Sequence, residues 1–242
     1  MKRTCLLFSA AVGLALNTSA SDKPLLAVPG KVIYENKLDG APSAPWKVAK
    51  GKWELVDGSW RGSEKPEDMH GAVTRLPNKL GDFVIEYELK FEGGKTTSLS
   101  INAVKDHMAR IVISPKLVTI QRDDNDHDGP DKAVVFARIA ADLKPGVWHK
   151  VRMEMVGDTM LGMVDDMIAY GSNELFTHDR MSPGFTVAGQ SVDFRNLKIT
   201  EATKNPEWDK VKATLPAPGS QMAAVPGPGA GKPAPKGKKN AE

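Results

Sequence analysis

Residues 148–165 read Trp-His-Lys-Val-Arg-Met-Glu-Met-Val-Gly-Asp-Thr-Met-Leu-Gly-Met-Val-Asp, and this stretch carries the clearest structural pattern in the chain. Val151, Met153 and Met155 alternate with charged residues, and apolar residues return after Gly157-Asp158. Alternation with a period of two is typical of a half-buried strand, and a Gly-Asp pair favours a tight turn between antiparallel strands. The stretch therefore predicts a long β-hairpin that ends in a second tight turn at residues 165–166.

The same alternation recurs along residues 28–202, and no segment there has a convincing helical pattern. From Phe83 to Phe91, aromatic and aliphatic side chains fall on one face of a strand and charged side chains on the other. Roughly a dozen such strands, separated by Gly- and Pro-containing turns, are too many for an immunoglobulin domain and suit a jelly roll. We therefore expect one all-β domain, a jelly-roll sandwich of two antiparallel sheets over residues 28–202.

The two ends of the chain differ from this domain in composition. Residues 1–20 combine a basic start, a short apolar run and a small-residue site at Thr18-Ser19-Ala20, which is the pattern of a signal peptide. We expect export to the periplasm or the extracellular space, with no transmembrane segment in the mature chain. Residues 203–242 are rich in Pro, Gly, Ala and Lys and predict a solvated, disordered tail, before which Trp208 can still pack onto the domain. The alternative is a weak electrostatic contact of the tail's lysines with an anionic envelope surface.

Charge and cysteine content argue against several classes of protein. Six of the 33 basic residues and one of the 30 acidic residues lie before residue 21 or after residue 215, which leaves 27 basic and 29 acidic groups between them. A domain of nearly balanced charge gives no indication of a nucleic-acid partner. The only cysteine, Cys5, falls in the expected signal peptide, so the mature protein would contain no disulfide and no thiol nucleophile.

Several segments resemble known jelly-roll proteins. The 148–165 stretch and residues 192–199, Val-Asp-Phe-Arg-Asn-Leu-Lys-Ile, together resemble the concanavalin A-like jelly roll. Residues 53–60 and 81–89, with the closing segment 185–189, are similar to the 3-keto-disaccharide hydrolases, also described as 3-keto-glucoside lyases or hydratases and formerly as a domain of unknown function. This resemblance implies a sandwich that engages glycans, with glycoside hydrolase or lyase activity on a 3-keto glycoside.

Strand alternation also places polar side chains opposite the core-facing ones. Glu86 and Glu88 project to one face, where two close carboxylates can act as catalytic acid and base, although two solvated glutamates would give the same pattern. The Glu-x-Asp-x-x-Glu run of laminarinase-type retaining glycosidases does not occur in the sequence. Carboxylate, amide and guanidinium groups together suit sugar hydroxyls, which both donate and accept hydrogen bonds. We hypothesise one glycan groove lined by Glu86, Glu88, Asn102 and Arg110, with His70 as a binding residue and His107 as a further catalytic candidate at its rim.

A separate acidic stretch is a candidate metal site. Residues 123–129 read Asp-Asp-Asn-Asp-His-Asp-Gly, and alternate oxygens in such a run converge on a hard cation while the glycine permits a sharp bend. Position twelve of the loop is Val135 instead of the bidentate glutamate of an EF-hand, so a solvated hairpin loop is the alternative. The candidate cofactor is calcium, and its candidate ligands are Asp124, Asp126 and Asp128.

The sequence therefore predicts an exported domain that engages a glycan, and it leaves two classes of function open. The first is an enzyme, which should bring an acid or a histidine and a charged partner together in one groove. The alternative is a non-catalytic carbohydrate-binding or protein-interaction module of the cell envelope, which should present aromatic and neutral hydrogen-bonding groups there.

Overall fold

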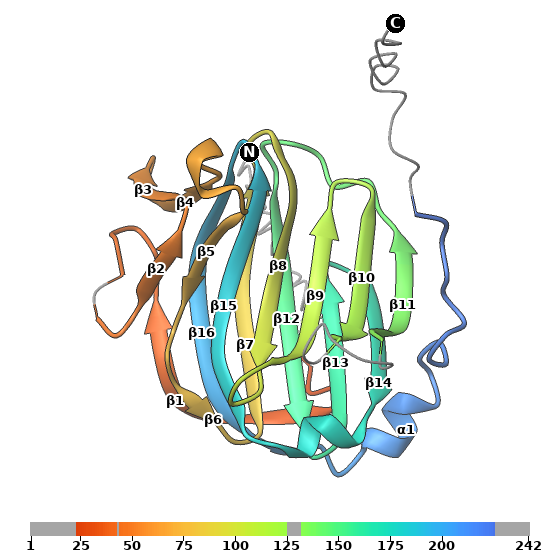
Figure 1. Ribbon diagram of the computed structural model, residues 1–242. Coiled ribbons are helices and arrows are strands. Elements are labelled where there is room, and N and C mark those ends of the chain that lie inside the picture. The colour runs from red at the N-terminus through yellow and green to blue at the C-terminus, as the bar shows by residue number, and fades with distance from the viewer. Residues whose placement is uncertain (1–22, 43, 125–131, 226–242) are drawn as a thin grey trace, which may run out of the picture.

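The computed structural model describes residues 23–42, 44–124 and 132–225, and within them it forms a sandwich of two antiparallel sheets (Figure 1). The strands of the first sheet are β1 (Ala27–Asn36), β3 (Lys52–Val56), β4 (Ser59–Ser63), β7 (Phe83–Phe91), β12 (Trp148–Val156), β13 (Thr159–Val164), β14 (Met167–Ser172) and β16 (Val192–Lys204). The strands of the second sheet are β2 (Lys47–Lys50), β5 (Ala72–Arg75), β6 (Lys79–Leu80), β8 (Gly94–Asn102), β9 (His107–Ser114), β10 (Leu117–Arg122), β11 (Val134–Ala140) and β15 (Arg180–Gly189). Over the same described ranges, three short helices accompany them, η2 (Pro66–Asp68), η3 (Glu174–Thr177) and α1 (Trp208–Lys212).

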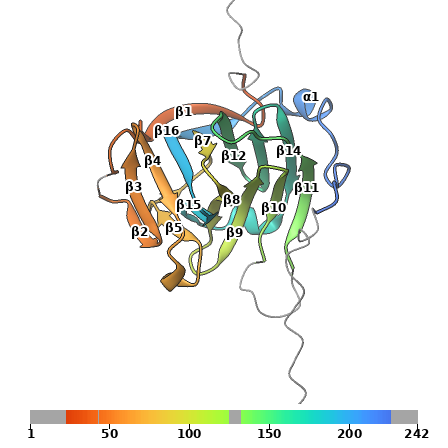
Figure 2. The same cartoon turned by 90° about the horizontal axis from the view of Figure 1, so that it is seen from above.

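The order of strands confirms the all-β, two-sheet prediction. The first sheet runs β14-β13-β12-β7-β16-β4-β3, with β1 also paired to β16, and the second runs β11-β10-β9-β8-β15-β5-β2, with β6 also paired to β15. Seen from above, β1 and β16 lie on one side of the sandwich and β9 and β10 on the other (Figure 2). Strands β2, β3 and β6 are two to five residues long, which is too short for alternation to reveal them in the sequence.

The hairpin predicted from residues 148–165 is present as β12 and β13. Val151 pairs with Val164 and Val156 with Thr159, so the strands are in register from end to end. Gly157 and Asp165 have φ angles of 55° and 52°, the left-handed conformation that these two tight turns require. The expected turn chemistry therefore sets the register of this half of the first sheet.

The main core lies between the two sheets and is centred on aromatic rings. Phe185 of the second sheet stacks on Phe194 of the first with ring centroids 4.5 Å apart, and Tyr87 packs on Phe185 at 4.8 Å. Phe185 and Phe194 are at most 1% exposed. Burial of each such ring stabilises the fold by about 1.5–3 kcal/mol, so these contacts hold the two sheets in one fixed relation.

The chain changes sheets between β7 and β8. The two strands are separated by two residues only, yet β7 belongs to the first sheet and β8 to the second. Gly93 makes this bend with a φ of 88°, and a Cβ at this position would lie 2.1 Å from the side-chain oxygen of Gln190. The outer faces of β7 and β8 therefore point to opposite sides of the molecule.

Packed structure continues beyond the expected end of the domain. Trp208 of α1 is 4% exposed and contacts Tyr170 on the outer face of the first sheet, in a cluster with Leu26 and Leu161. Further on, Gln221 and its neighbours form backbone hydrogen bonds to β11. The expectation that a disordered tail starts at residue 203 is therefore corrected for residues 203–225.

Residues 1–22 and 226–242 lie outside the described residues, and with them the expected signal peptide and the lysines of the tail. In the part of the chain that the structure describes, no helix is long and apolar enough to cross a bilayer.

Candidate functional site

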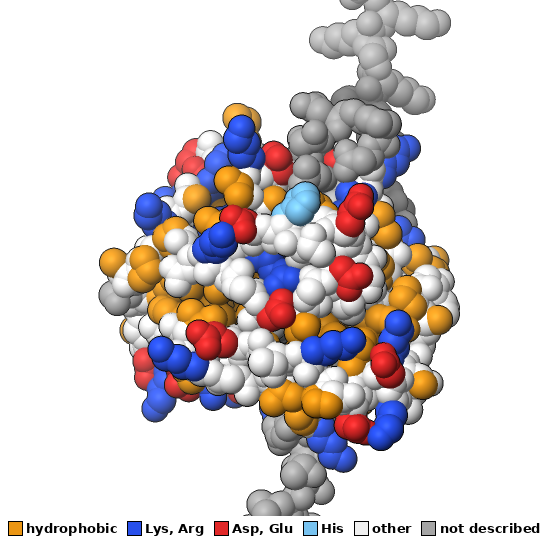
Figure 3. All heavy atoms as spheres, turned by 90° about the horizontal axis from the view of Figure 1, so that it is seen from below, with side chains coloured by type: hydrophobic (Ala, Val, Ile, Leu, Met, Phe, Trp, Pro, Cys, Tyr) orange, Lys and Arg blue, Asp and Glu red, His pale blue; other side chains and the backbone are white. Residues whose placement is uncertain are grey.

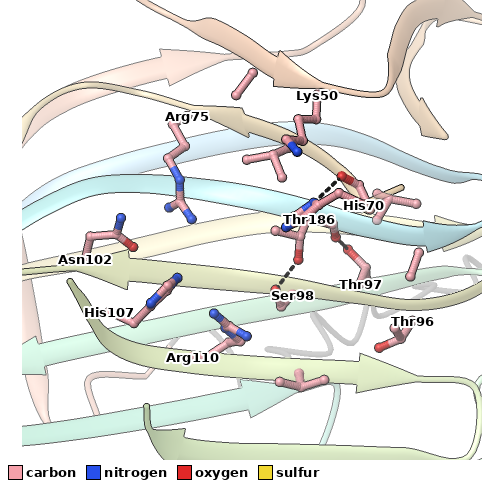
Figure 4. Close-up of a pocket in the computed structure, with 16 residues that line it drawn as sticks. Lys50, His70, Arg75, Thr96, Thr97, Ser98, Asn102, His107, Arg110 and Thr186 are labelled. Carbon is pink, nitrogen blue, oxygen red and sulfur yellow. Dashed lines mark hydrogen bonds between the residues drawn. The ribbon is translucent and has the colours of Figure 1, made fainter. Parts of the chain in front are cut away.

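A pocket of about 600 Å³ lies on the outer face of the second sheet, and we call it the outer pocket (Figure 4). Strands β5, β8, β9 and β15 contribute most of its lining, and β2 and the segment before β5 contribute the rest. Its polar side chains are those of Lys50, His70, Arg75, Thr96, Thr97, Ser98, Asn102, His107, Arg110 and Thr186.

Strand register explains why two arginines face this pocket. Arg75 on β5 pairs with Gly184 on β15, Gly184 pairs with Ser100 on β8, and Ser100 pairs with Arg110 on β9. Paired residues on neighbouring strands point to the same face, so the two long side chains flank two small ones. The result is a trough whose walls carry guanidinium groups and whose floor is made of small residues.

The adjacent row of the same face supplies hydroxyl groups. Val73, Thr186, Ser98 and Val112 are paired in this order across β5, β15, β8 and β9. The hydroxyls of Ser98 and Thr186 form a hydrogen bond with each other at the centre of the row. Hydroxyl groups therefore lie beside the charged row, flanked by one apolar side chain on each side.

Arg75 is held over the floor by neutral oxygens. Its Nη1 donates to the hydroxyl of Ser100 at 3.2 Å and to the backbone carbonyl of Ser182 at 3.0 Å. Burial lowers the pKa of Arg75 from its ordinary value of 12.5, and the positive charge of Arg110 lowers this pKa further. The guanidinium thus remains charged at neutral pH but is in an environment that disfavours positive charge.

Arg110, in contrast, forms an ion pair with a carboxylate. Its Nε lies 3.1 Å from Oδ2 of Asp123, which is 3% exposed and also accepts a hydrogen bond from Gln121 at 2.7 Å. A buried ion pair of this kind fixes the position of the guanidinium, because moving it away would leave the Asp123 carboxylate buried without compensation. Asp123 therefore positions Arg110 toward the outer pocket.

Four of the six residues proposed for the glycan groove line the outer pocket, namely His70, Asn102, His107 and Arg110. Asn102 pairs with His107 at one end of β8 and β9, and Arg110 lies three residues further along β9. His70 approaches from the segment before β5, where its Nδ1 lies 2.8 Å from the backbone carbonyl of Gly71. Figure 4 shows these side chains entering the same space from different strands.

Glu86 and Glu88 do not belong to this pocket, so the expectation of one shared groove is wrong for them. Both lie on β7 of the first sheet, where Glu86 pairs with Arg152 at 2.9 Å and Glu88 accepts a hydrogen bond from Arg195 at 2.7 Å. They line a separate hollow of about 160 Å³. Alternation identified the outward face of each strand correctly, but it carries no information on which sheet the strand joins.

Arg75, Lys50, Ser98 and Thr186 were missed by sequence reasoning. Arg75 follows the apolar pair Ala72-Val73, and its two-residue spacing from Val73 was a signal that both face the same side. Nothing in the sequence indicates that β5 and β9 lie on either side of β15 and β8, because this order depends on pairing between distant segments. The charged pair of the site is therefore visible only in the folded structure.

The proposed calcium ligands are mostly outside the described residues. Asp126 and Asp128 fall in the segment 125–131, and Asp124 is the last residue described before it. In the described ranges, no group of three or more His, Cys, Asp or Glu side chains is arranged to hold a metal ion. Calcium binding at Asp124, Asp126 and Asp128 therefore stays a prediction.

Comparison with solved structures finds the same fold in several other proteins. The carbohydrate-binding module CBM66 from Bacillus subtilis is similar with a TM-score of 0.50 and 16% identity, over 64% of this chain and 95% of the module. The laminarinase from Rhodothermus marinus is similar with a TM-score of 0.55 and 10% identity, over 73% of this chain and all of the enzyme (100%). The Crh5 transglycosylase in complex with NAG gives 0.56 and 10%, over 75% of this chain and 88% of that one.

By sequence, no family model and no curated protein matches the chain. Identities of 16% or less show a shared fold and leave the ligand and the chemistry to be argued from the pocket itself.

Proposed function

We propose that this protein binds a glycan in the outer pocket. The observation that carries the proposal is the pair of adjacent rows on the second sheet, one with guanidinium groups and one with hydroxyls, on a floor of small residues. Sugar hydroxyls need donors and acceptors at spacings similar to those between neighbouring side chains of a sheet. A volume of about 600 Å³ is within the range of small-ligand sites and accommodates a short oligosaccharide.

The structural neighbours support the same substrate class. A carbohydrate-binding module, a laminarinase and a transglycosylase complexed with NAG share the fold. We extend glycan engagement from them to this chain because the outer pocket presents the chemistry that it requires. Export to the periplasm or the extracellular space, where such ligands occur, is part of the proposal.

The finer assignment, a hydrolase or lyase acting on a 3-keto glycoside, depends on which residues a bound sugar can reach. Glu86 and Glu88 lie on the opposite sheet and cannot act on a ligand in the outer pocket. Of the three catalytic candidates, His107 is the one that lines this pocket. An imidazole beside a guanidinium can transfer a proton next to a developing negative charge, so His107 and Arg110 are the pair to test.

The alternative is a non-catalytic binding module, and one experiment separates it from an enzyme. The purified protein is titrated calorimetrically with laminarin, levan and chito-oligosaccharides, and each mixture, together with a 3-keto glucoside, is analysed for released products. Binding without product in every case supports a binding module, whereas release that is lost in His107→Ala but not in Glu88→Gln supports catalysis in the outer pocket.

Variants of the pocket lining test the location of the site. Thr186→Val keeps the shape of the side chain and removes its hydroxyl, so we expect about a five- to tenfold loss of affinity. Lys31→Gln, on exposed β1 of the other sheet, is the control and should bind as the unmodified protein does. Unchanged binding in Thr186→Val and Asn102→Ala would place the glycan elsewhere.

A further inference from the structure

The charged side chains that line the outer pocket, among the described residues, are Lys50, Arg75 and Arg110. The lower end of the molecule, in contrast, shows acidic and basic side chains interspersed (Figure 3). The described domain also has nearly balanced charge over its sequence. A concentration of basic groups in one concave site is therefore a local feature, and clefts lined by one sign of charge attract ligands of the opposite sign.

The two arginines approach the pocket from opposite walls. Arg75 and Arg110 are three strands apart in one register row, which corresponds to roughly 14 Å between their backbones at about 4.8 Å per strand. Figure 4 shows both arginine side chains pointing into the pocket from its two sides. A group bound between them would receive hydrogen bonds from two planar guanidinium forks, the geometry that suits carboxylate and sulfate oxygens.

The positive charge of this pair is only partly compensated within the described residues. Asp123 lies 3.1 Å from Arg110, and its negative charge also raises the pKa of Arg75 in part, while the hydrogen bonds of the Arg75 guanidinium go to the neutral oxygens of Ser100 and Ser182. Burial and the nearby Arg110 charge lower the pKa of Arg75, so its charged form is stabilised less than it would be in water. An anion between the two arginines would remove this repulsion.

Gly184 keeps the space under Arg75 open. A Cβ at position 184 would lie 2.7 Å from Cγ of Arg75 and 2.3 Å from the backbone oxygen of Thr74. Both distances are shorter than any normal carbon contact, so a larger residue would displace Arg75 from the pocket. The position of the second guanidinium thus depends on the absence of a side chain on the neighbouring strand.

We infer that the glycan of the outer pocket is acidic and that its carboxylate or sulfate group is bound between Arg75 and Arg110. This inference rests on the proposed function and specifies its ligand. The anionic substituent is held by the charged row, and the ring hydroxyls lie on the adjacent row, at Ser98 and Thr186. The two rows are two residues apart along each strand, which corresponds to roughly 7 Å at about 3.4 Å per residue.

The test compares matched pairs of oligosaccharides by calorimetry on the full mature chain. One pair is an oligogalacturonide and its carboxyl-reduced neutral form, and the other is a sulfated galactan oligosaccharide and its desulfated form. We expect the acidic member of at least one pair to bind about tenfold more tightly, because hydrogen bonds to charged groups are among the strongest in proteins. Which pair shows the difference identifies the anion as carboxylate or sulfate.

Variants assign the effect to the arginine pair. Arg75→Gln should lose the preference for the acidic member while keeping affinity for the neutral one, and Lys31→Gln, which changes net charge equally, should keep the preference. The dependence of affinity on ionic strength tests the same charge interaction without a variant. Raising ionic strength should weaken binding of the acidic member and leave the neutral member unchanged.

Two outcomes distinguish failure of the acidic-ligand inference from failure of the proposed glycan binding. Equal binding of both members of both pairs would overturn the acidic ligand and leave glycan binding in place. Absence of binding to every acidic and neutral oligosaccharide, in a protein whose circular dichroism and melting are normal, would overturn glycan binding itself and the inference with it. A preference retained in a folded Arg75→Gln protein would place the anion away from this pair.

Discussion

Replacing Trp208 with alanine should destabilise the whole domain, although this residue lies beyond the last strand. The side chain is 4% exposed and meets Tyr170 edge-on, with ring centroids 5.4 Å apart and an interplanar angle of 90°. The change removes on the order of 150 Å² of buried apolar surface, which at about 25 cal/mol per Å² corresponds to roughly 4 kcal/mol. Part of this surface is also buried in the unfolded chain, so we expect a loss of about 3 kcal/mol in the free energy of unfolding.

Urea denaturation followed by far-UV circular dichroism measures this loss without depending on tryptophan fluorescence. Lys210→Ala is the matched control in the same helix, because its side chain is 80% exposed and its ion pair is with the exposed Glu207. The control should stay within about 0.5 kcal/mol of the unmodified protein. A loss below about 1 kcal/mol in Trp208→Ala would refute the docking of α1 and restore the disordered tail that composition suggested.

Four further changes have defined outcomes. Gly184→Ala should lower the free energy of unfolding by about 1–3 kcal/mol and, by displacing Arg75, weaken binding of the acidic glycan. Normal values of both in denaturation and calorimetry would contradict the contact. Ending the chain after Leu215 should lower the melting temperature by several degrees through lost hydrogen bonds to β11, and an unchanged melt would show that this segment does not dock. Burial raises the pKa of Glu154 above its ordinary 4.5, so the folded state holds the proton more tightly and stability falls as pH rises from 4.5 through the raised value. Glu154→Gln should remove that part of the fall in urea titrations at pH 4–7, and identical pH slopes would exclude Glu154 as its source. If the acidic stretch 123–129 binds calcium, saturating calcium should raise the melting temperature. Equal melting temperatures with calcium and with a chelator would exclude calcium binding by this stretch.

The fold was predictable because its main signals are local. The hairpin at 148–165 needed only alternation and a Gly-Asp turn, both of which act over a few residues. The change of sheet between β7 and β8 was not predictable, since Gly93 is equally compatible with a hairpin inside one sheet. That single bend separates Glu86 from Asn102, and it accounts for the error in the proposed groove.

The disorder predicted from composition is wrong for residues 203–225 for a different reason. A sequence rich in Pro and Gly lacks the apolar periodicity that predicts a helix or a strand. Such a segment can still pack along a neighbouring strand if a few of its backbone groups form hydrogen bonds and one large side chain is buried. Here Trp208 supplies the buried surface and Gln221 the backbone contact. Both partners lie on strands distant in sequence, Tyr170 on β14 and Arg138 on β11. Such contacts are set by tertiary structure and leave no local pattern.

The course of residues 219–223 also bears on association between copies of the protein. Strand β11 is the last strand of the second sheet, and the amide and carbonyl of its Arg138 are paired with Gln221 and Ala223 at 2.7 and 2.9 Å. An unpaired strand at the end of a sheet is a template on which another chain can add a strand and start aggregation. The residues just before the covering segment extend this edge poorly, because Pro216 and Pro218 lack the amide hydrogen that a further strand would need. Residues 219–223 thus occupy the edge of β11 on which another copy of the chain would otherwise add a strand.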